Sequence, residues 1–183
     1  MIAQTNDQKL PFYEIPQAQE DYTSGNILSR MIDGLGYRYY WATEGLSEKD
    51  LAYRPSEEAR NINETLEHLL GLSGTIRNAP TSTANIRPVD FSELTFAEKR
   101  KMTLNNLQEA SKLFKNKTAG EIKDMKLIFN RGEKSFDFPF WNMINGPIAD
   151  AIYHTGQVVS FRRSAGNPMN PGVNVFMGKT REQ

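Results

Sequence analysis

The 183-residue chain contains no cysteine. A disulfide framework, thiolate ligation of a metal and a cysteine nucleophile are therefore all excluded. Any sulfur chemistry would have to arrive with a substrate. Histidine is also scarce, with two residues in the whole chain, His68 and His154. Imidazole chemistry is thus confined to these two positions.

The chain has no excess of charge of either sign. Its 22 basic and 22 acidic residues balance, and the isoelectric point is near 6.8. The longest basic run is Lys99-Arg100-Lys101. A run this short does not provide a surface that follows a phosphate backbone, so we expect no nucleic-acid partner.

Long hydrophobic runs are missing as well. The amino-terminal residues lack the apolar run of a signal peptide, and no stretch reaches the roughly 18 apolar residues of a membrane span. We therefore expect a soluble, cytoplasmic protein without membrane association. A chain of this length can bury enough apolar surface to form one stable domain.

Helical periodicity dominates the middle of the chain. Apolar residues recur every three or four positions from about Ser24, and again over 62–77, over 93–115 and in a last helix that ends at Gly166. The last helix starts either near Phe140 or at Pro147. Residues 126–138 alternate as a short hairpin does. These patterns predict an all-α fold, an up-down four-helix bundle with a short hairpin or irregular insert before the last helix. We divide the chain into an extended arm (1–22), the bundle (23–168) and a carboxyl-terminal tail packed on the bundle (169–183).

The last predicted helix carries two titratable residues among apolar ones. Asp150 and His154 are four residues apart and share a stripe with Val158 and Phe161, so both are expected to face inward. Two interpretations are open. The two residues form an i, i+4 helix pair worth a few tenths of a kcal/mol, or both bind one metal ion. The metal interpretation requires a third ligand from another helix.

His68 is the candidate for that third ligand. It lies about 100° from the centre of the apolar face of the second helix, where a side chain leans into the groove between two helices. A half-buried histidine bonded to a backbone carbonyl is the alternative. The combination favours a metal site, because both histidines of the chain lie on apolar helices and one has a carboxylate at ligand spacing.

Two stretches resemble one known family. "LSEKDLAYRPSEEARNINETLEHLLGLS" (46–73) and "ADAIYHTGQVVSFRRSAGNP" (149–168) are similar to DinB-like (YfiT-like) proteins, which are four-helix-bundle metal-dependent hydrolases and thiol transferases. The resemblance covers roughly residues 24–168. It implies that His68 is a metal ligand from the second helix and that His154 is the second histidine of a His-x-x-x-His pair. Asp150 replaces the first histidine of that pair.

The resemblance implies a DinB-like protein with a two-histidine, one-carboxylate site for a divalent transition metal. Zn²⁺ or Ni²⁺ is expected first, and Fe²⁺ or Mn²⁺ also suits such ligands. The implied activity is that of a metal-dependent hydrolase or thiol transferase on a small molecule, with a low-molecular-weight thiol as cosubstrate, in a homodimer. The alternative is a non-catalytic, ligand-binding or oligomerising bundle with a degenerate, metal-free site. Arg162 and Arg163 either complement the helix dipole or hold an anionic substrate.

Overall fold

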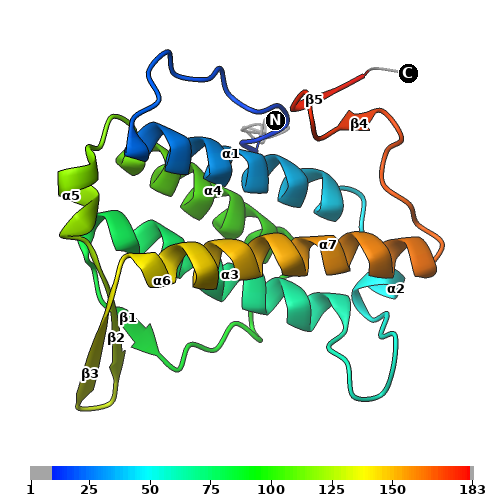
Figure 1. Cartoon of the computed structure of the whole chain (residues 1–183). Helices are drawn as coiled ribbons and strands as arrows, with labels where there is room; N and C mark the ends of the chain where they lie inside the picture. The colour runs from blue at the N-terminus through cyan, green and yellow to red at the C-terminus, as the bar shows by residue number, and fades with distance from the viewer. Residues whose placement is uncertain (1–9, 182–183) are drawn as a thin grey trace, which may run out of the picture.

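A computed structural model describes residues 10–181 of the chain. Four long helices surround one apolar core (Figure 1). In chain order they are α1 (Ser24–Thr43), α3 (Ile62–Asn78), α4 (Phe96–Phe114) and α7 (Ala149–Ser164). α4 and α7 each contact both α1 and α3. Within the described residues, no helix is long and apolar enough to cross a membrane.

The start of α3 is fixed by a capping box. The Asn61 side chain accepts a hydrogen bond from Glu64 N at 2.8 Å, and the Glu64 carboxylate accepts one from Asn61 N at 2.8 Å. Such a reciprocal pair satisfies two backbone donors that have no intrahelical partner. His68 follows in the second turn of α3, so its position relative to the helix start is well defined.

The predicted all-α four-helix bundle is wrong, because the chain forms a mixed α/β structure. Strand β1 (Asn85–Arg87) pairs in parallel with β2 (Lys126–Arg131), and β2 pairs antiparallel with β3 (Lys134–Pro139). Two further short strands, β4 (Val173–Asn174) and β5 (Lys179–Thr180), form a second sheet. The shorter helical elements are α2 (Glu48–Leu51), η1 (Ala79–Thr81), α5 (Ala119–Lys123), α6 (Trp141–Met143) and η2 (Ile144–Ile148).

The strands carry little periodic signal, so the sheet was predicted only in part. β1 has only three residues, too few to display a period of two, and its partner lies about forty positions further along the chain. Every residue of β3 is exposed, so no buried face marks the strand. The hairpin itself was predicted, and it exists as β2–β3. What the sequence did not indicate is that β1 extends this hairpin into a three-stranded sheet.

The segment before α7 continues the helix through a distortion. α6, the π-helical turn η2 and α7 follow one another without a break. Gly146 has φ −95° and ψ −105° inside η2, next to Pro147, which has no N–H to donate. The last helix therefore begins near Phe140 and not at Pro147. Such π-turns occur frequently at functional sites, and this one ends two residues before Asp150.

The described parts of the predicted arm and tail pack on α1 and on each other. The Phe12 ring is buried against Gly36, where a Cβ would lie 2.5 Å from the ring, so the residue must be glycine. Ile15 N donates to Gly178 O at 2.9 Å and joins arm to tail. The remainder of the predicted arm (1–9) and the end of the predicted tail (182–183) lie outside the described residues.

Candidate metal centre

The structure brings the three predicted site residues together between α3 and α7. Nε2 of His68 lies 2.9 Å from Oδ2 of Asp150, and Nε2 of His154 lies 3.3 Å from Oδ1 of the same carboxylate. The two imidazole rings meet edge to face, with their centroids 4.6 Å apart. One ligand atom from each residue lies within 4.8 Å of the other two.

The site lies at the edge of the core. The buried face of α7 consists of Ala151, Thr155, Val158 and Arg162. Asp150 and His154 each precede a member of that face by one position, which turns them about 100° towards α3. The Asp150 side chain is 40% exposed, that of His68 30% and that of His154 13%. Solvent therefore reaches the carboxylate, and the prediction that it points into the interior is wrong.

Gln157 fixes the orientation of the His154 ring. Its Oε1 lies 2.6 Å from Nδ1 of His154, and its Nε2 donates to the phenol oxygen of Tyr153 at 3.2 Å. An amide oxygen can only accept, so Nδ1 of His154 carries a proton. In the neutral ring Nε2 then has a free lone pair, and this lone pair faces the Asp150 carboxylate. A hydrogen bond to the far nitrogen is the usual way in which a protein orients a metal-binding histidine.

Electrostatics favour the neutral form of His68. Burial lowers the pKa of its imidazole, and the positive charge of Arg60 acts in the same direction, while the hydrogen bond to Asp150 opposes both. Neutral imidazole is the form that binds metal ions. Nδ1 of His68 makes no hydrogen bond to any residue between 10 and 181. No side chain of this region therefore holds the ring away from a metal ion.

The three side chains suit a divalent transition metal. Ligand distances of about 2.0–2.2 Å in a tetrahedral site place neighbouring ligand atoms about 3.3–3.6 Å apart. The 3.3 Å separation between His154 and Asp150 agrees with this range, and the 2.9 Å separation between His68 and Asp150 is shorter, that of a direct hydrogen bond. Two imidazoles and one carboxylate bind Zn²⁺ or Ni²⁺ well and also accept Fe²⁺ or Mn²⁺. Solvent exposure of the carboxylate leaves room for further ligands.

Arg162 has a structural role. This role replaces the alternative that Arg162 holds an anionic substrate. Its side chain is buried, and Nη1 donates to the carbonyl oxygens of Trp41, Ala42 and Glu44, each at 3.0 Å. These carbonyls lie at the end of α1, where backbone acceptors have no intrahelical donor. Asn167 accepts two further hydrogen bonds from the same guanidinium. Arg162 thus caps α1.

Comparison of the chain with protein-family models, curated proteins and solved structures finds no match. The likeness to DinB-like proteins therefore rests on the chain's own residues, and the function is argued from the site. Sequence reasoning did not assign Gln157 its contact with His154, although the spacing of three residues on one helix allows that contact. It also missed Arg60 and Arg87, which line the pocket beside His68.

Proposed function

We propose that this chain is a DinB-like protein that binds one divalent transition metal through His68, Asp150 and His154. Its activity would be hydrolysis of a small molecule, or transfer of a low-molecular-weight thiol to one. When bound, such an ion polarises a substrate and lowers the pKa of a coordinated water or thiol, which makes either a nucleophile near neutral pH. The chain's lack of cysteine means that the thiol would be a cosubstrate.

The observation that carries the proposal is the contact between His154 and Asp150. With the proton of the neutral ring on Nδ1, two electron-rich atoms face each other across 3.3 Å. They repel unless a positive charge lies between or beside them. That charge is either a second proton on His154 or a metal ion. The convergence of His68 on the same carboxylate supports the metal, since the tautomer with its proton on Nδ1 directs the Nε2 lone pair to the same place.

The ligands and their neighbours have separate roles at the proposed metal site. Asp150 contributes the one negative charge among the three ligands, which favours a cation over neutral occupants. Gln157 holds the His154 ring through Nδ1, and Tyr153 supports the Gln157 amide. Tyr153 is 63% exposed beside His154. Its phenol is therefore placed where it can contact a substrate that approaches the site from solvent.

Metal analysis of protein purified without an affinity tag or chelator tests the proposal. We expect close to one equivalent of a transition metal in the native chain and a loss of most of it in His68→Ala and His154→Ala. Asp137→Asn is the matched control, because Asp137 is an exposed hairpin carboxylate paired with Lys126. Absence of metal after incubation with Zn²⁺, Ni²⁺, Fe²⁺ and Mn²⁺ would instead identify His68, Asp150 and His154 as a structural ion-pair cluster in a non-catalytic module.

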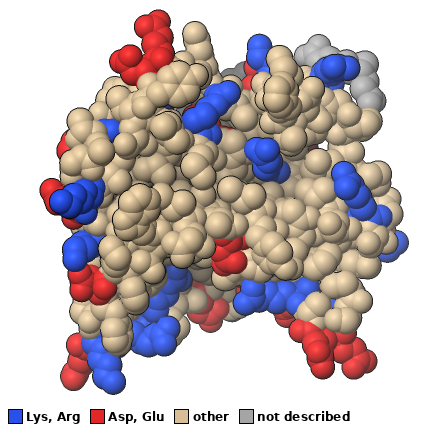
Figure 2. Space-filling model, in the orientation of Figure 1, with Lys and Arg blue, Asp and Glu red and all other residues tan. Residues whose placement is uncertain are grey.

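The proposal includes a homodimer formed through the face over α1 and α7. Most of that face is covered by uncharged side chains (Figure 2). Its exposed apolar residues include Met31, Ile152 and Phe176. Exposed apolar residues that lie along one groove, as these three do, are typical of a protein–protein contact. Light scattering should give the mass of two chains for the native protein and of one chain for Ile152→Glu; an unchanged mass in the variant would place the contact elsewhere.

A further inference from the structure

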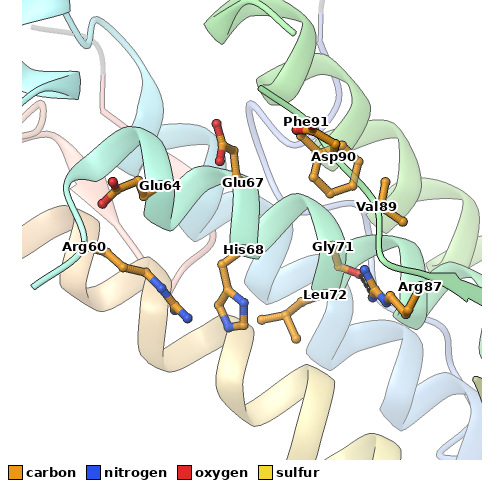
Figure 3. A pocket seen from close by; sticks show the side chains of 10 residues that line it. All are labelled: Arg60, Glu64, Glu67, His68, Gly71, Leu72, Arg87, Val89, Asp90 and Phe91. Carbon is orange, nitrogen blue, oxygen red and sulfur yellow. Dashed lines mark hydrogen bonds between the residues drawn. The ribbon is translucent and has the colours of Figure 1, made fainter. Parts of the chain in front are cut away.

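A second feature of α3 is a pocket that shares His68 with the candidate metal centre. The pocket has a volume of about 630 Å³ and lies between α3 and the segment that follows β1. Figure 3 shows His68 between two arginines, Arg60 before the start of α3 and Arg87 at the end of β1, with Leu72 beside the ring. Arg60 and His68 point towards the ribbon of α7. The pocket thus adjoins the metal centre through one shared side chain.

Most carboxylates of the pocket already have cationic partners. Glu64 accepts hydrogen bonds from Arg54 Nη2 at 2.9 and 3.0 Å. Glu67 accepts one from Lys99 Nζ at 2.7 Å. The third carboxylate, Asp90, accepts a hydrogen bond from the backbone of Ser92, and Figure 3 shows it across the α3 ribbon from the His68 ring.

The two arginines, by contrast, have no carboxylate partner. Within residues 10–181 neither Arg60 nor Arg87 forms an ion pair. With Arg54 and Lys99 neutralising Glu64 and Glu67, the pocket keeps two positive charges against the single negative charge of Asp90. The carboxylate of Asp150, 2.9 Å from Nε2 of His68, belongs to the metal centre on the far side of the ring, so the unpaired charges that line the pocket itself are two guanidinium groups and Asp90.

Hydrogen bonds to α3 hold the Arg87 side chain in this position. Its Nη2 donates to Gly71 O at 3.1 Å and to Thr75 Oγ1 at 3.0 Å. A Cβ at residue 71 would lie 3.3 Å from Nη1, so Gly71 leaves space for the guanidinium. Burial lowers the pKa of Arg87, and the nearby charge of Arg131 adds to this. A half-buried cation without a counterion is unfavourable, and a bound anion would relieve that cost.

We propose that this pocket binds an oxyanion group of the substrate, a carboxylate or a phosphate, through the guanidinium groups of Arg60 and Arg87. Guanidinium groups bind both oxyanions through paired, charge-assisted hydrogen bonds. The inference rests on the proposed metal function, because His68 joins the two sites. It narrows the substrate to a small molecule with an anionic group on one side of its reacting bond, so that the anion lies in the pocket while the bond lies at the metal centre.

Calorimetric titration with succinate and with inorganic phosphate, in separate arms at low ionic strength, tests the inference. We expect the native chain to bind at least one probe with a Kd below about 10 mM. The arm with the tighter binding identifies the preferred oxyanion. Arg60→Ala should raise that Kd about 10-fold to 100-fold, and Arg60→Glu should abolish binding, since charge-assisted hydrogen bonds are the stronger class. Arg77→Ala, which removes an exposed arginine at the end of α3 that pairs with Glu109, should leave the Kd unchanged.

Arg87→Lys is the second variant, because lysine keeps the charge at this half-buried position but loses the paired donors. It should also raise the Kd. The inference is overturned if the native chain binds neither probe, or if the Arg60 and Arg87 variants bind as tightly as the native chain. The metal content of every sample separates this result from the proposed function. Metal retained without oxyanion binding refutes only the inference, whereas oxyanion binding without metal refutes only the metal site.

Discussion

Replacing Asp150 by asparagine distinguishes a metal ligand from a member of a structural ion pair. The Asp150 side chain is 40% exposed and that of His68 30%. Ion pairs with such exposure contribute about 0–1 kcal/mol to stability. If the carboxylate only pairs with the histidines, Asp150→Asn should therefore lower the free energy of unfolding of the metal-free chain by at most about 1 kcal/mol. It should have no effect that depends on added metal.

A metal ligand gives a different and larger signal. An ion present at 100 times its Kd stabilises the folded state by about 2.7 kcal/mol. For a chain of this size that corresponds to a rise in Tm of about 5–11 °C. Loss of one of three ligands should raise the Kd at least about 100-fold, which at the same concentration leaves about 0.4 kcal/mol of stabilisation. The rise in Tm then shrinks to about 1–2 °C.

The assay is thermal unfolding of the native chain, Asp150→Asn and Asp137→Asn without metal and, in separate samples, with Zn²⁺, Ni²⁺, Fe²⁺ or Mn²⁺ at one fixed concentration. The Asp137 variant removes an exposed carboxylate of the hairpin, so it should keep the full rise in Tm. If Asp150→Asn also keeps the full rise, its carboxylate is not a ligand and the proposed site is wrong. If the native chain shows no rise with any of the four metals, the ion-pair interpretation is supported.

Three further predictions concern Gln157 beside the site, Arg162 at the end of α1, and Asp50 on α2. Gln157→Leu should weaken metal binding about 10-fold to 100-fold without loss of helix content, because the His154 ring loses its orienting hydrogen bond. Competition with a chelating dye measures the metal affinity. An unchanged affinity would contradict the prediction. Arg162→Met leaves three carbonyls at the end of α1 without their donor, so urea unfolding should show a loss of about 3–5 kcal/mol at unchanged metal content. Burial alone would raise the pKa of Asp50, but hydrogen bonds from Ser47 and Asn167 hold it below its ordinary value. The ionised Asp50 carboxylate therefore stabilises the fold fully above the unfolded pKa of about 3.9, and this stabilisation is lost as the pH falls through the lower folded pKa. Asp50→Asn should flatten the dependence of Tm on pH below about pH 4. An unchanged slope of Tm against pH in that range would refute the prediction.

The helices were the predictable part of this fold. α3 was expected over 62–77 and extends over Ile62–Asn78, because its apolar spacing and its Asn61 cap both agree with a helix there. The strands were not predictable to the same degree. β1 depends on pairing with a distant segment, and its three residues carry no pattern of their own. The start of the last helix was left open, since Pro147 suits both a first turn and a distorted interior, and the π-turn selects the second.

The candidate site shows the same division between local and tertiary information. The spacing of Asp150 and His154 places them on one side of α7 whatever the fold, so their proximity was predictable. The contact with His68 depends on how α3 packs against α7, and only the flank position of His68 pointed to it. Arg162 was ambiguous because its partners are carbonyls at the end of another helix, about 120 residues earlier in the chain.

One helix, α3, joins the proposed metal centre to the proposed oxyanion pocket. Its second turn supplies His68, and its next turn carries Gly71, whose missing side chain and carbonyl oxygen hold Arg87. The capping box at Asn61 fixes the register of both turns relative to the helix start. α3 therefore fixes the spacing between His68 and Arg87, whereas Asp150 and His154 belong to α7. Because the packing of α3 against α7 sets the distance from the proposed pocket to the rest of the proposed metal centre, a change in that packing should change which substrate length fits.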